Sequence, residues 1–329
     1  MTKKEKIQVT ILSESEVESV APPLHDIIKI VEETFRMQGQ GKLEVPTKIG
    51  VHPDFPRSFL HAMPAWVSEA GALGLKWISY YPGNFQKGLP DSSAVIILNH
   101  PDHGLPVAIM SGMFITYTRT AACAAVAAKY LAPPDPIRLG LVGCGGLGRW
   151  SLLALSEVFP NLIEVRVASR TVESRQKFCK KMSVQGPWHL QPVDHVRDAV
   201  EGMDIIISST PHPPEPPIKG EWWNDRTLAI PLDVLSGWDD RAFELVERLV
   251  TDNYDGLIKR KPQDRERFRL PERWNHLADI ITEKAPGRQD IHERIMAIPT
   301  GIASLDMTLG WEVYRQAQKV KLGVKVQLS

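Results

Sequence analysis

The residues of segment 143–148 are the first in this chain whose types and spacing point to chemistry. Four of the six are glycines, and they directly follow the apolar run 138–142, which is typical of a buried strand. Gly143 permits a tight turn, Gly145 lets a pyrophosphate approach the backbone, and Gly148 lets the following helix pack closely on the strand. The N-terminus of that helix offers unpaired N–H groups to phosphate oxygens. We therefore predict a dinucleotide site that includes Gly143, Gly145, Gly146, Leu147 and Gly148.

The end of the next predicted strand, 163–168, bears on which dinucleotide binds. An Asp or Glu at this place would accept hydrogen bonds from an adenosine ribose, but the chain continues with Ser169, Arg170 and Thr171. Arg170 can instead pair with a 2′-phosphate through its planar guanidinium group. The sequence therefore favours NADP(H) over NAD(H), and a plain surface arginine is the alternative interpretation of Arg170.

Two cationic side chains outside this segment have the chemistry that reduction of a C=N bond needs. Such a reaction needs a proton donor and a cation that binds the substrate carboxylate. Lys76 lies at the end of a predicted strand beside apolar residues, and partial burial would lower its pKa toward neutrality. Arg119 lies near the start of a predicted alanine-rich helix, where the guanidinium and the helix N-terminus can hold a carboxylate together. A lysine that only extends its charged end to solvent is the alternative for Lys76.

The composition argues against several classes of protein. The 329 residues carry 39 Lys plus Arg and 39 Asp plus Glu, so no excess of positive charge favours nucleic acid or an acidic membrane surface. No window approaches the roughly 18 apolar residues of a membrane span. The three cysteines are far apart and the histidines lack metal-ligand spacing, so we expect neither a disulfide framework nor a metal site. The first residues are basic and then polar, unlike a secretory signal, so we expect a cytoplasmic protein.

The predicted elements fall into two groups that meet at the proline-rich segment 133–136. Beyond it strands and helices alternate, which predicts a parallel sheet covered on both faces, and residues 254–298 are expected to be helical. Before it, short strand-like segments separated by proline and glycine predict a mixed, largely antiparallel α+β layer. The predicted strands are 7–12, 47–52, 58–63, 74–80, 94–99, 137–142, 163–168, 204–209, 227–232 and 247–252, and the other predicted helices include 112–132, 147–158, 172–182 and 301–322.

A series of motifs along nearly the whole chain, from about Val9 to Leu328, resembles the ornithine cyclodeaminase/mu-crystallin family. Each motif alone is modest, but their order and spacing are specific. They are 74–77 (Gly-Leu-Lys-Trp), 81–84 (Tyr-Pro-Gly-Asn), 88–90 (Gly-Leu-Pro), 104–108 (Gly-Leu-Pro-Val-Ala), 116–122 (Thr-Tyr-Thr-Arg-Thr-Ala-Ala), the glycine loop, and 301–306 (Gly-Ile-Ala-Ser-Leu-Asp).

The resemblance implies an α/β fold with a Rossmann NAD(P)-binding domain over 133–300. Residues 1–132 with 301–329 would form an α+β substrate-binding and dimerisation domain, to which the C-terminal helix returns. Members of the family form homodimers or larger oligomers, bind NAD(P), and act on small amino acids, α-keto acids or cyclic imines. Lys76 matches the catalytic lysine of the family and Arg119 its carboxylate-binding arginine. Lys48 stands where members usually carry a second substrate-binding arginine, and a lysine keeps the charge but loses the bidentate fork.

The catalytic aspartate of the family would fall at Asp233, just past the predicted strand 227–232. The carboxyl end of a parallel strand suits such a role, although the residues around Asp233 depart from the family pattern. Asp239 and Asp240 are competing positions, and a helix N-cap is the alternative explanation for them. Thr210 and His212, which follow the predicted strand 204–209, are further candidates for contact with the cofactor.

These residues predict an NAD(P)H-dependent reductase or dehydrogenase acting on an imine, amino acid or keto acid that carries an α-carboxylate. Two alternatives stay open. One is an ornithine cyclodeaminase-type lyase that releases ammonia with a recycled cofactor. The other is an NADPH-dependent ligand-binding protein like mu-crystallin.

Overall fold

The computed structural model describes residues 7–53, 57–210, 213–259 and 269–328, which form two compact units. The first unit contains the described residues up to Arg119 and those from Ile302 onward, and the second runs from Thr120 to Gly301. The division falls inside helix α3 (Met113–Leu131), rather than at the proline-rich segment 133–136.

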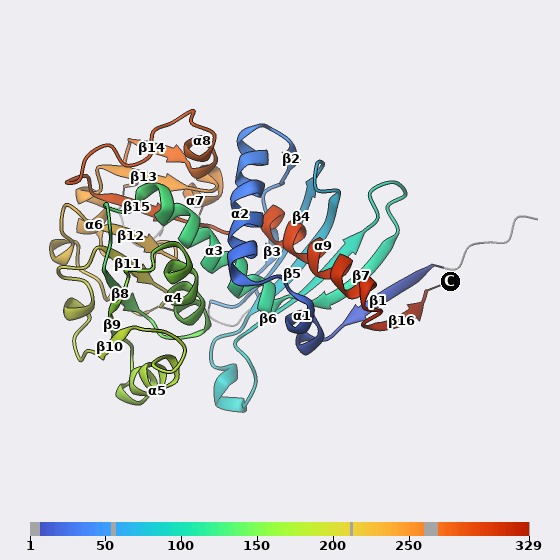
Figure 1. The fold of residues 1–329 in the computed structure, drawn as a ribbon, viewed down its shortest axis with the longest axis horizontal. Coiled ribbons are helices and arrows are strands. Elements are labelled where there is room, and N and C mark those ends of the chain that lie inside the picture. Colours follow the sequence, from blue (N-terminus) through green and yellow to red (C-terminus); the bar gives the residue numbers. More distant parts are fainter. Residues whose placement is uncertain (1–6, 54–56, 211–212, 260–268, 329) are drawn as a thin grey trace, which may run out of the picture. The chain divides into compact units, whose positions relative to one another are not determined.

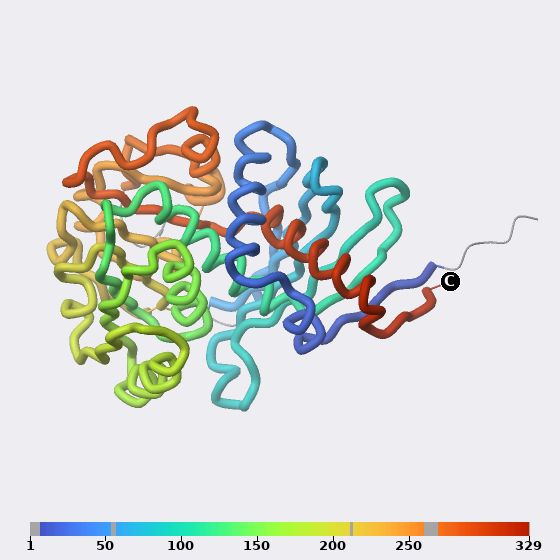
Figure 2. Tube along the Cα trace, viewed as in Figure 1, coloured from blue at the N-terminus to red at the C-terminus, as the bar shows by residue number. Residues whose placement is uncertain are grey.

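The first unit is built on a mixed sheet in the order β16-β1-β7-β6-β5-β4-β2, with β3 also paired to β4. Strands β4 to β7 are antiparallel neighbours, whereas β1 and β7 run parallel. Figure 2 shows the first and last strands, β1 and β16, side by side. The strands are β1 Gln8–Leu12, β2 Leu43–Glu44, β3 Ile49–Val51, β4 Phe59–Val67, β5 Ala72–Tyr80, β6 Ser92–Asn99, β7 Pro106–Ser111 and β16 Val324–Gln327. The predicted antiparallel layer is confirmed, but β2, β7 and β16 were not predicted.

Helix α9 (Ala303–Lys319) packs across one face of this sheet, on β4, β5 and β6 (Figure 1). Its partners on the outer side are α1 (Glu14–Val20) and α2 (Leu24–Gly39). Glycine at position 74 of β5 permits the close approach, because a Cβ there would lie 2.8 Å from Met307 Sδ and 2.3 Å from the Ile97 carbonyl oxygen. The last helix of the chain therefore forms the core of the first unit together with strands β4, β5 and β6.

The other face of the sheet carries apolar side chains that are partly exposed. Trp77 pairs with Ala62 and Val95 on the neighbouring strands, and it is 40% exposed. Side chains of directly paired residues point to the same side of a sheet. This face, which we call the open sheet face, comprises Ile11, Ala62, Pro64, Leu75, Trp77, Val95, Ile97 and Ile109.

The second unit contains a sheet in the order β10-β9-β8-β11-β12-β15-β13-β14, in which every described pairing is parallel. Strands β11, β12, β13 and β15 are buried at every position, and α4 and α5 follow β8 and β9 as crossover helices. This is the predicted Rossmann arrangement, and it is confirmed. The strands are β8 Arg138–Val142, β9 Glu164–Ala168, β10 His189–Pro192, β11 Ile205–Ser208, β12 Leu228–Pro231, β13 Arg248–Thr251, β14 Trp274–His276 and β15 Ile295–Ile298. The helices are α4 Gly146–Val158, α5 Val172–Met182, α6 Asp240–Leu245, α7 Tyr254–Ile258 and α8 Leu277–Ile281.

The prediction that residues 254–298 are helical is wrong for much of its described part. Only α7 and α8 are helical there, and β14 and β15 extend the parallel sheet. The four buried residues of β15 form a short apolar run, and such a run has no periodicity that distinguishes a strand from a helix.

Candidate active site

The glycine loop of the second unit has the geometry of a phosphate cradle. Gly143 has a φ of +110°, and a Cβ there would lie 2.7 Å from the Ser209 carbonyl oxygen. A Cβ on Gly148 would lie 2.4 Å from the Gly143 carbonyl oxygen, so glycine allows the helix to pack against the turn. A Cβ on Gly145, by contrast, would point into open space. The structure therefore gives Gly143 and Gly148 the packing roles that the sequence predicts.

Helix α4 begins at Gly146, directly after Gly145, and Leu147 lies in its first turn. The N–H groups of this turn have no intrahelical acceptors, and they lie at the positive end of the helix dipole. Together with the open space at Gly145, they fit the pyrophosphate of a dinucleotide. Arg149 adds a cation in the same turn, and its guanidinium lies 5.2 Å from the centre of the Trp150 ring.

The end of β9 carries a cluster of hydroxyl groups next to two arginines. Ser169 Oγ lies 2.7 Å from Ser174 Oγ, and Thr171 caps α5 by accepting a hydrogen bond from Ser174 N. Arg170 is exposed, whereas Arg175 is buried, donates to the Ser169 carbonyl oxygen and pairs with Asp194. Sequence reasoning missed Arg175, although its position one turn after Thr171 on α5 is compatible with contact to the strand end.

Asp233 lies just beyond the end of β12, where hydroxyl groups from the adjacent strand β11 bind its carboxylate. Ser208 Oγ donates to Oδ1 at 2.8 Å, and the Thr210 N–H and Oγ1 donate to Oδ2 at 3.0 and 2.6 Å. Glycine at position 237 makes room for the carboxylate, because a Cβ there would lie 2.4 Å from Oδ2. The structure therefore brings Asp233 and Thr210 together at the carboxyl edge of the parallel sheet.

Desolvation raises the pKa of Asp233, while the hydrogen bonds from Thr210 and Ser208 act in the opposite direction. Of the two competing positions, Asp239 is the N-cap of α6 and accepts from Ala242 N, as its alternative explanation predicts. Asp240 begins the same helix. His212 lies outside the described residues.

In the first unit, Lys76 and Arg119 meet at the carboxylate of Asp306. Lys76 Nζ lies 2.7 Å from Asp306 Oδ2, and Arg119 Nε donates to Asp306 Oδ1 at 2.9 Å. Lys76 and Asp306 are fully buried, and Arg119 is 5% exposed. We call these three residues the charged triad.

The elements that carry the triad explain its geometry. Lys76 lies in the middle of β5 on the face that α9 covers, so the prediction that it ends a strand is wrong. Arg119 is in the second turn of α3, further along the helix than its first N–H groups. Asp306 is in the first turn of α9, where the helix dipole favours a negative charge.

Burial and the nearby Arg119 guanidinium lower the pKa of Lys76 to about 8, although the Asp306 carboxylate acts in the opposite direction. The sequence-based expectation of a lowered lysine pKa is therefore confirmed. A lysine with this pKa is partly protonated at neutral to mildly alkaline pH, so it can both donate and accept a proton.

Lys48 directly precedes β3, where Ile49 pairs with Ala62 of β4. The next residue of β4, Met63, pairs with Lys76. If the pairing of β3 with β4 continues for one more residue, Lys48 lies opposite Met63. The backbones of Lys48 and Lys76 are then two strand spacings apart, or about 10 Å.

Asp306 is the residue of this site that sequence reasoning missed, although it ends the motif 301–306. An acidic residue in the first turn of a helix is common because it offsets the helix dipole, so its type gave no separate signal. The triad and Lys48 belong to the first unit, whereas Asp233, Thr210 and the glycine loop belong to the second.

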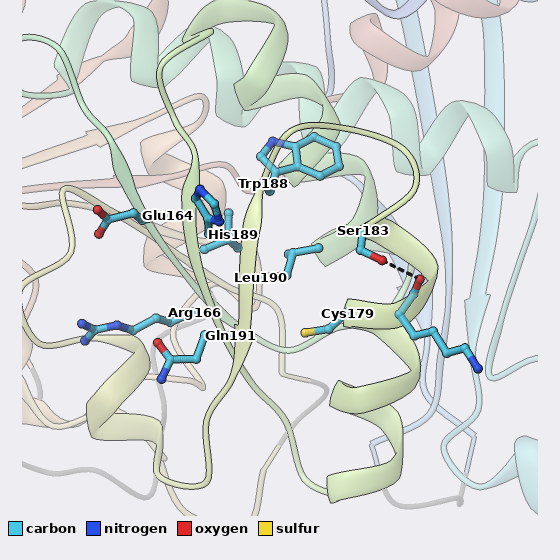
Figure 3. Close-up of a pocket in the computed structure, with 10 residues that line it drawn as sticks. Glu164, Arg166, Cys179, Ser183, Trp188, His189, Leu190 and Gln191 are labelled. Carbon is cyan, nitrogen blue, oxygen red and sulfur yellow. Dashed lines mark hydrogen bonds between the residues drawn. The ribbon is translucent and has the colours of Figure 1, made fainter.

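A cavity of about 710 Å³ lies elsewhere on the second unit, over the first half of β9, β10 and the end of α5 (Figure 3). Glu164, Arg166, Cys179, Trp188 and His189 are among its lining residues. None of the sequence-predicted site residues lines it, so we assign it no part in the candidate site.

Within the described ranges, no helix is long and apolar enough to cross a membrane. The same part of the chain contains no group of three or more His, Cys, Asp or Glu side chains placed to hold a metal ion. The cysteines Cys123, Cys144 and Cys179 are all free.

The fully parallel sheet with its glycine loop, together with a second unit built on a mixed sheet, defines a two-domain α/β protein of the Rossmann class. Within that class, the chain belongs to the ornithine cyclodeaminase/mu-crystallin family, whose sequence pattern matches residues 8–321.

Two relatives and one solved structure match over almost their whole length. The nodulation efficiency protein NfeD of Rhizobium meliloti is 30% identical, over 96% of this chain and 97% of that protein. An alanine dehydrogenase of Archaeoglobus fulgidus is 30% identical, over 98% of this chain and 99% of that protein. Among solved structures, the pyrroline-2-carboxylate reductase of Thermococcus litoralis, in complex with NADH and L-proline, superimposes with a TM-score of 0.87 at 29% identity, over 97% of this chain and all of that chain.

Proposed function

We propose that this protein is an NAD(P)H-dependent reductase that acts on a C=N bond next to a carboxylate. The observation that carries the proposal is the charged triad, in which a lysine with a pKa of about 8 lies beside a buried arginine. Arg119, with Lys48, binds the substrate carboxylate, and Lys76 donates a proton to the imine nitrogen. The nicotinamide, when bound, supplies the hydride.

The relatives support this choice of chemistry. The Archaeoglobus fulgidus protein is an alanine dehydrogenase and the Thermococcus litoralis protein reduces pyrroline-2-carboxylate. Both reactions interconvert an amine and an imine next to a carboxylate. A proton donor and a carboxylate-binding cation serve both of them.

The test is oxidation of NADPH and NADH by the purified protein. The substrates are pyrroline-2-carboxylate, its six-membered analogue, and pyruvate or glyoxylate with ammonium or amines. We expect oxidation with at least one of them, and no oxidation with any would overturn the proposal. Ammonia release from ornithine or lysine without net change in the cofactor would instead establish a cyclodeaminase. Tight binding of imines without turnover would establish a ligand-binding protein.

We propose NADP(H) as the preferred cofactor, with Arg170 bound to the 2′-phosphate and Ser169 and Thr171 beside it. The hydroxyl cluster and the absence of an acidic residue in positions 169–171 support this choice. Loss of a charge-assisted hydrogen bond of about 1.5–3 kcal/mol predicts that Arg170→Ala weakens NADPH binding by about 10- to 100-fold and leaves NADH binding unchanged. Lys177→Ala, on the exposed side of α5, is the matched control. An intact NADPH preference in Arg170→Ala, or no preference in the wild type, would contradict this assignment.

We propose Asp233 as a second acid–base residue, held in place by Ser208 and Thr210. The raised pKa of its carboxyl group supports this role. Asp233→Asn should lower kcat by about 10²-fold or more. Asp239→Asn removes the charge of a carboxylate that caps α6, accepts from Gly220 N and lies near Lys219, and it should leave kcat unchanged. Equal kcat values for Asp233→Asn and Asp239→Asn would show that Asp233 has only a structural role, in which it links the ends of β11 and β12.

We also propose that the protein is a homodimer that forms through the open sheet face. Trp77, Val95 and Ile11 are about 40% exposed on that face, and their neighbours there are apolar. A contiguous apolar surface of this kind is typical of a protein–protein interface. An archaeal alanine dehydrogenase of known structure, 28% identical to this chain, is a dimer, which favours a second copy of the chain as the partner.

A further inference from the structure

Asp306 lies between the two cations on which the proposed reaction depends. Its Oδ1 accepts from Arg119 Nε and its Oδ2 lies 2.7 Å from Lys76 Nζ, so both oxygens face a positive charge. Two cations and one anion leave a net charge of +1 in a buried group when all three are ionised. A substrate carboxylate would neutralise that charge.

Contact through Nε orients Arg119 in a specific way. A guanidinium group has five N–H donors in a planar fork, and its Nε–H points away from the edge that the two terminal nitrogens share. The side-chain hydrogen bond that joins Arg119 to Asp306 uses Nε. Asp306 therefore holds Arg119 from the side and leaves its paired terminal N–H groups for bidentate contact with a carboxylate.

Asp306 also acts directly on the protonation of the Lys76 ammonium group. The neighbours of Lys76 on β4 and β6 are Met63 and Ile96, which are apolar. The titratable groups that act on it are Arg119 from α3, which disfavours its charge, and Asp306 from α9, which favours it. Without the carboxylate, desolvation and repulsion by Arg119 would act on the ammonium group unopposed.

We propose that Asp306 is a positioning residue of the active site. One oxygen of its carboxylate holds Arg119, which binds the substrate carboxylate, and the other holds Lys76, which donates the proton. This inference rests on the proposed function and adds a residue that acts through the other two. The short aspartate side chain fits the close approach of α9 to β5 that Gly74 permits. A glutamate would move the carboxylate by one methylene.

The first readout is the pH dependence of kcat/KM for imine reduction. Activity should fall as pH rises through about 8, because deprotonated Lys76 cannot donate a proton. In Asp306→Asn the remaining Arg119 lowers the lysine pKa further. The alkaline limb of the pH profile, in which activity falls, should therefore move to lower pH by about 1 to 3 units, and the rate should be lower. In Asp306→Glu the limb should stay near its place, while kcat/KM still falls about tenfold or more because the geometry changes.

The second readout is binding of pyrrole-2-carboxylate, a planar five-membered ring acid, measured by calorimetry without turnover. Asp306→Asn should weaken it at least tenfold, because Arg119 is no longer held in place. The control is Asp204→Asn, which removes another buried, arginine-paired carboxylate in the second unit. Asp204→Asn should lower stability but leave the pH limb and the binding unchanged.

An Asp306→Asn variant that is folded, by circular dichroism, and keeps the wild-type pH limb and affinity would overturn the inference. If the wild type reduces no imine, the proposed function fails. The binding measurement then still tests whether Asp306 orients Arg119. If Asp306→Asn does not fold, Asp306→Glu alone decides: an unchanged kcat/KM in that variant would refute the positioning role.

Discussion

At the scale of residues, the three members of the charged triad do not contribute equally to stability. Asp306 keeps a cation beside it when Lys76 is removed. Lys76 and Arg119, by contrast, lose the one anion that they share within the described residues when Asp306 is neutralised. Removing one partner of a buried ion pair is costly when it leaves an uncompensated buried charge.

Lys76→Met should therefore leave the free energy of unfolding within about 1 kcal/mol of the wild type or raise it, because Asp306 keeps Arg119. Asp306→Asn should lower it by about 3–5 kcal/mol. Lys76→Met should also lower kcat/KM by about 10²- to 10⁴-fold, because the proton donor is gone. Urea unfolding and steady-state rates measure both effects. Equal destabilisation by the two substitutions would contradict the shared-carboxylate description.

Much of the site could be predicted from residue types and short motifs. The glycine loop, Lys76 and Arg119 each have a local pattern that carries a physical meaning, and the structure gives the loop its predicted packing and Lys76 its lowered pKa. Asp306 could not be singled out in this way, because its importance arises from contact with residues of β5 and α3 that are distant in sequence. Such a contact is set by tertiary packing, which a helical pattern does not encode.

At the scale of elements, α9 determines where Asp306 lies, and Gly74 determines how closely α9 approaches β5. Gly74→Ala would place a Cβ 2.3 Å from a backbone oxygen of β6, so a strand must shift. We expect a loss of about 1–3 kcal/mol in stability, because overpacking forces backbone movement, and lower kcat/KM, because Lys76 is two residues away on the same face.

Gly310→Ala is the matched substitution in the same interface. A Cβ at position 310 of α9 would meet its neighbours at 3.5 Å or more, which is ordinary contact. Alanine has the higher helix propensity, so this variant should be neutral or more stable by up to about 1 kcal/mol. Thermal unfolding of both variants checks the pair. A Gly74→Ala variant as stable and active as Gly310→Ala would show that α9 tolerates displacement.

The elements themselves were predictable where a pattern was long or bounded by clear signals. Helix α5, for example, has the bounds that its periodicity predicts, and Thr171 caps it. The strands that were missed are short or lack alternation: β15 is buried at all four positions and β16 is exposed at all four. Their strand character comes from pairing with β13 and β1, which is a property of the sheet.

At the scale of the whole molecule, the open sheet face is an exposed apolar surface that a protein partner could cover. Its opposite face is covered by α9, while Trp77, Val95 and Ile11 remain about 40% exposed. A stable dimer typically buries about 800 Å² on each partner. Because dimer interfaces depend on a few buried aromatic anchors, Trp77 is the residue whose loss should matter most.

We therefore expect Trp77→Glu to convert a dimer into a monomer, since a C2 interface would place the new charge on both copies. Light scattering after size-exclusion chromatography measures the mass, which should fall from about twice the chain mass of 36.8 kDa to that of one chain. Phe85→Glu, at a residue 57% exposed outside the sheet, is the control and should remain dimeric. Trp77 points away from the face that carries Lys76, because successive residues of a strand alternate. A monomeric Trp77→Glu that still binds pyrrole-2-carboxylate would separate assembly from substrate binding, and a dimeric Trp77→Glu would place the interface elsewhere.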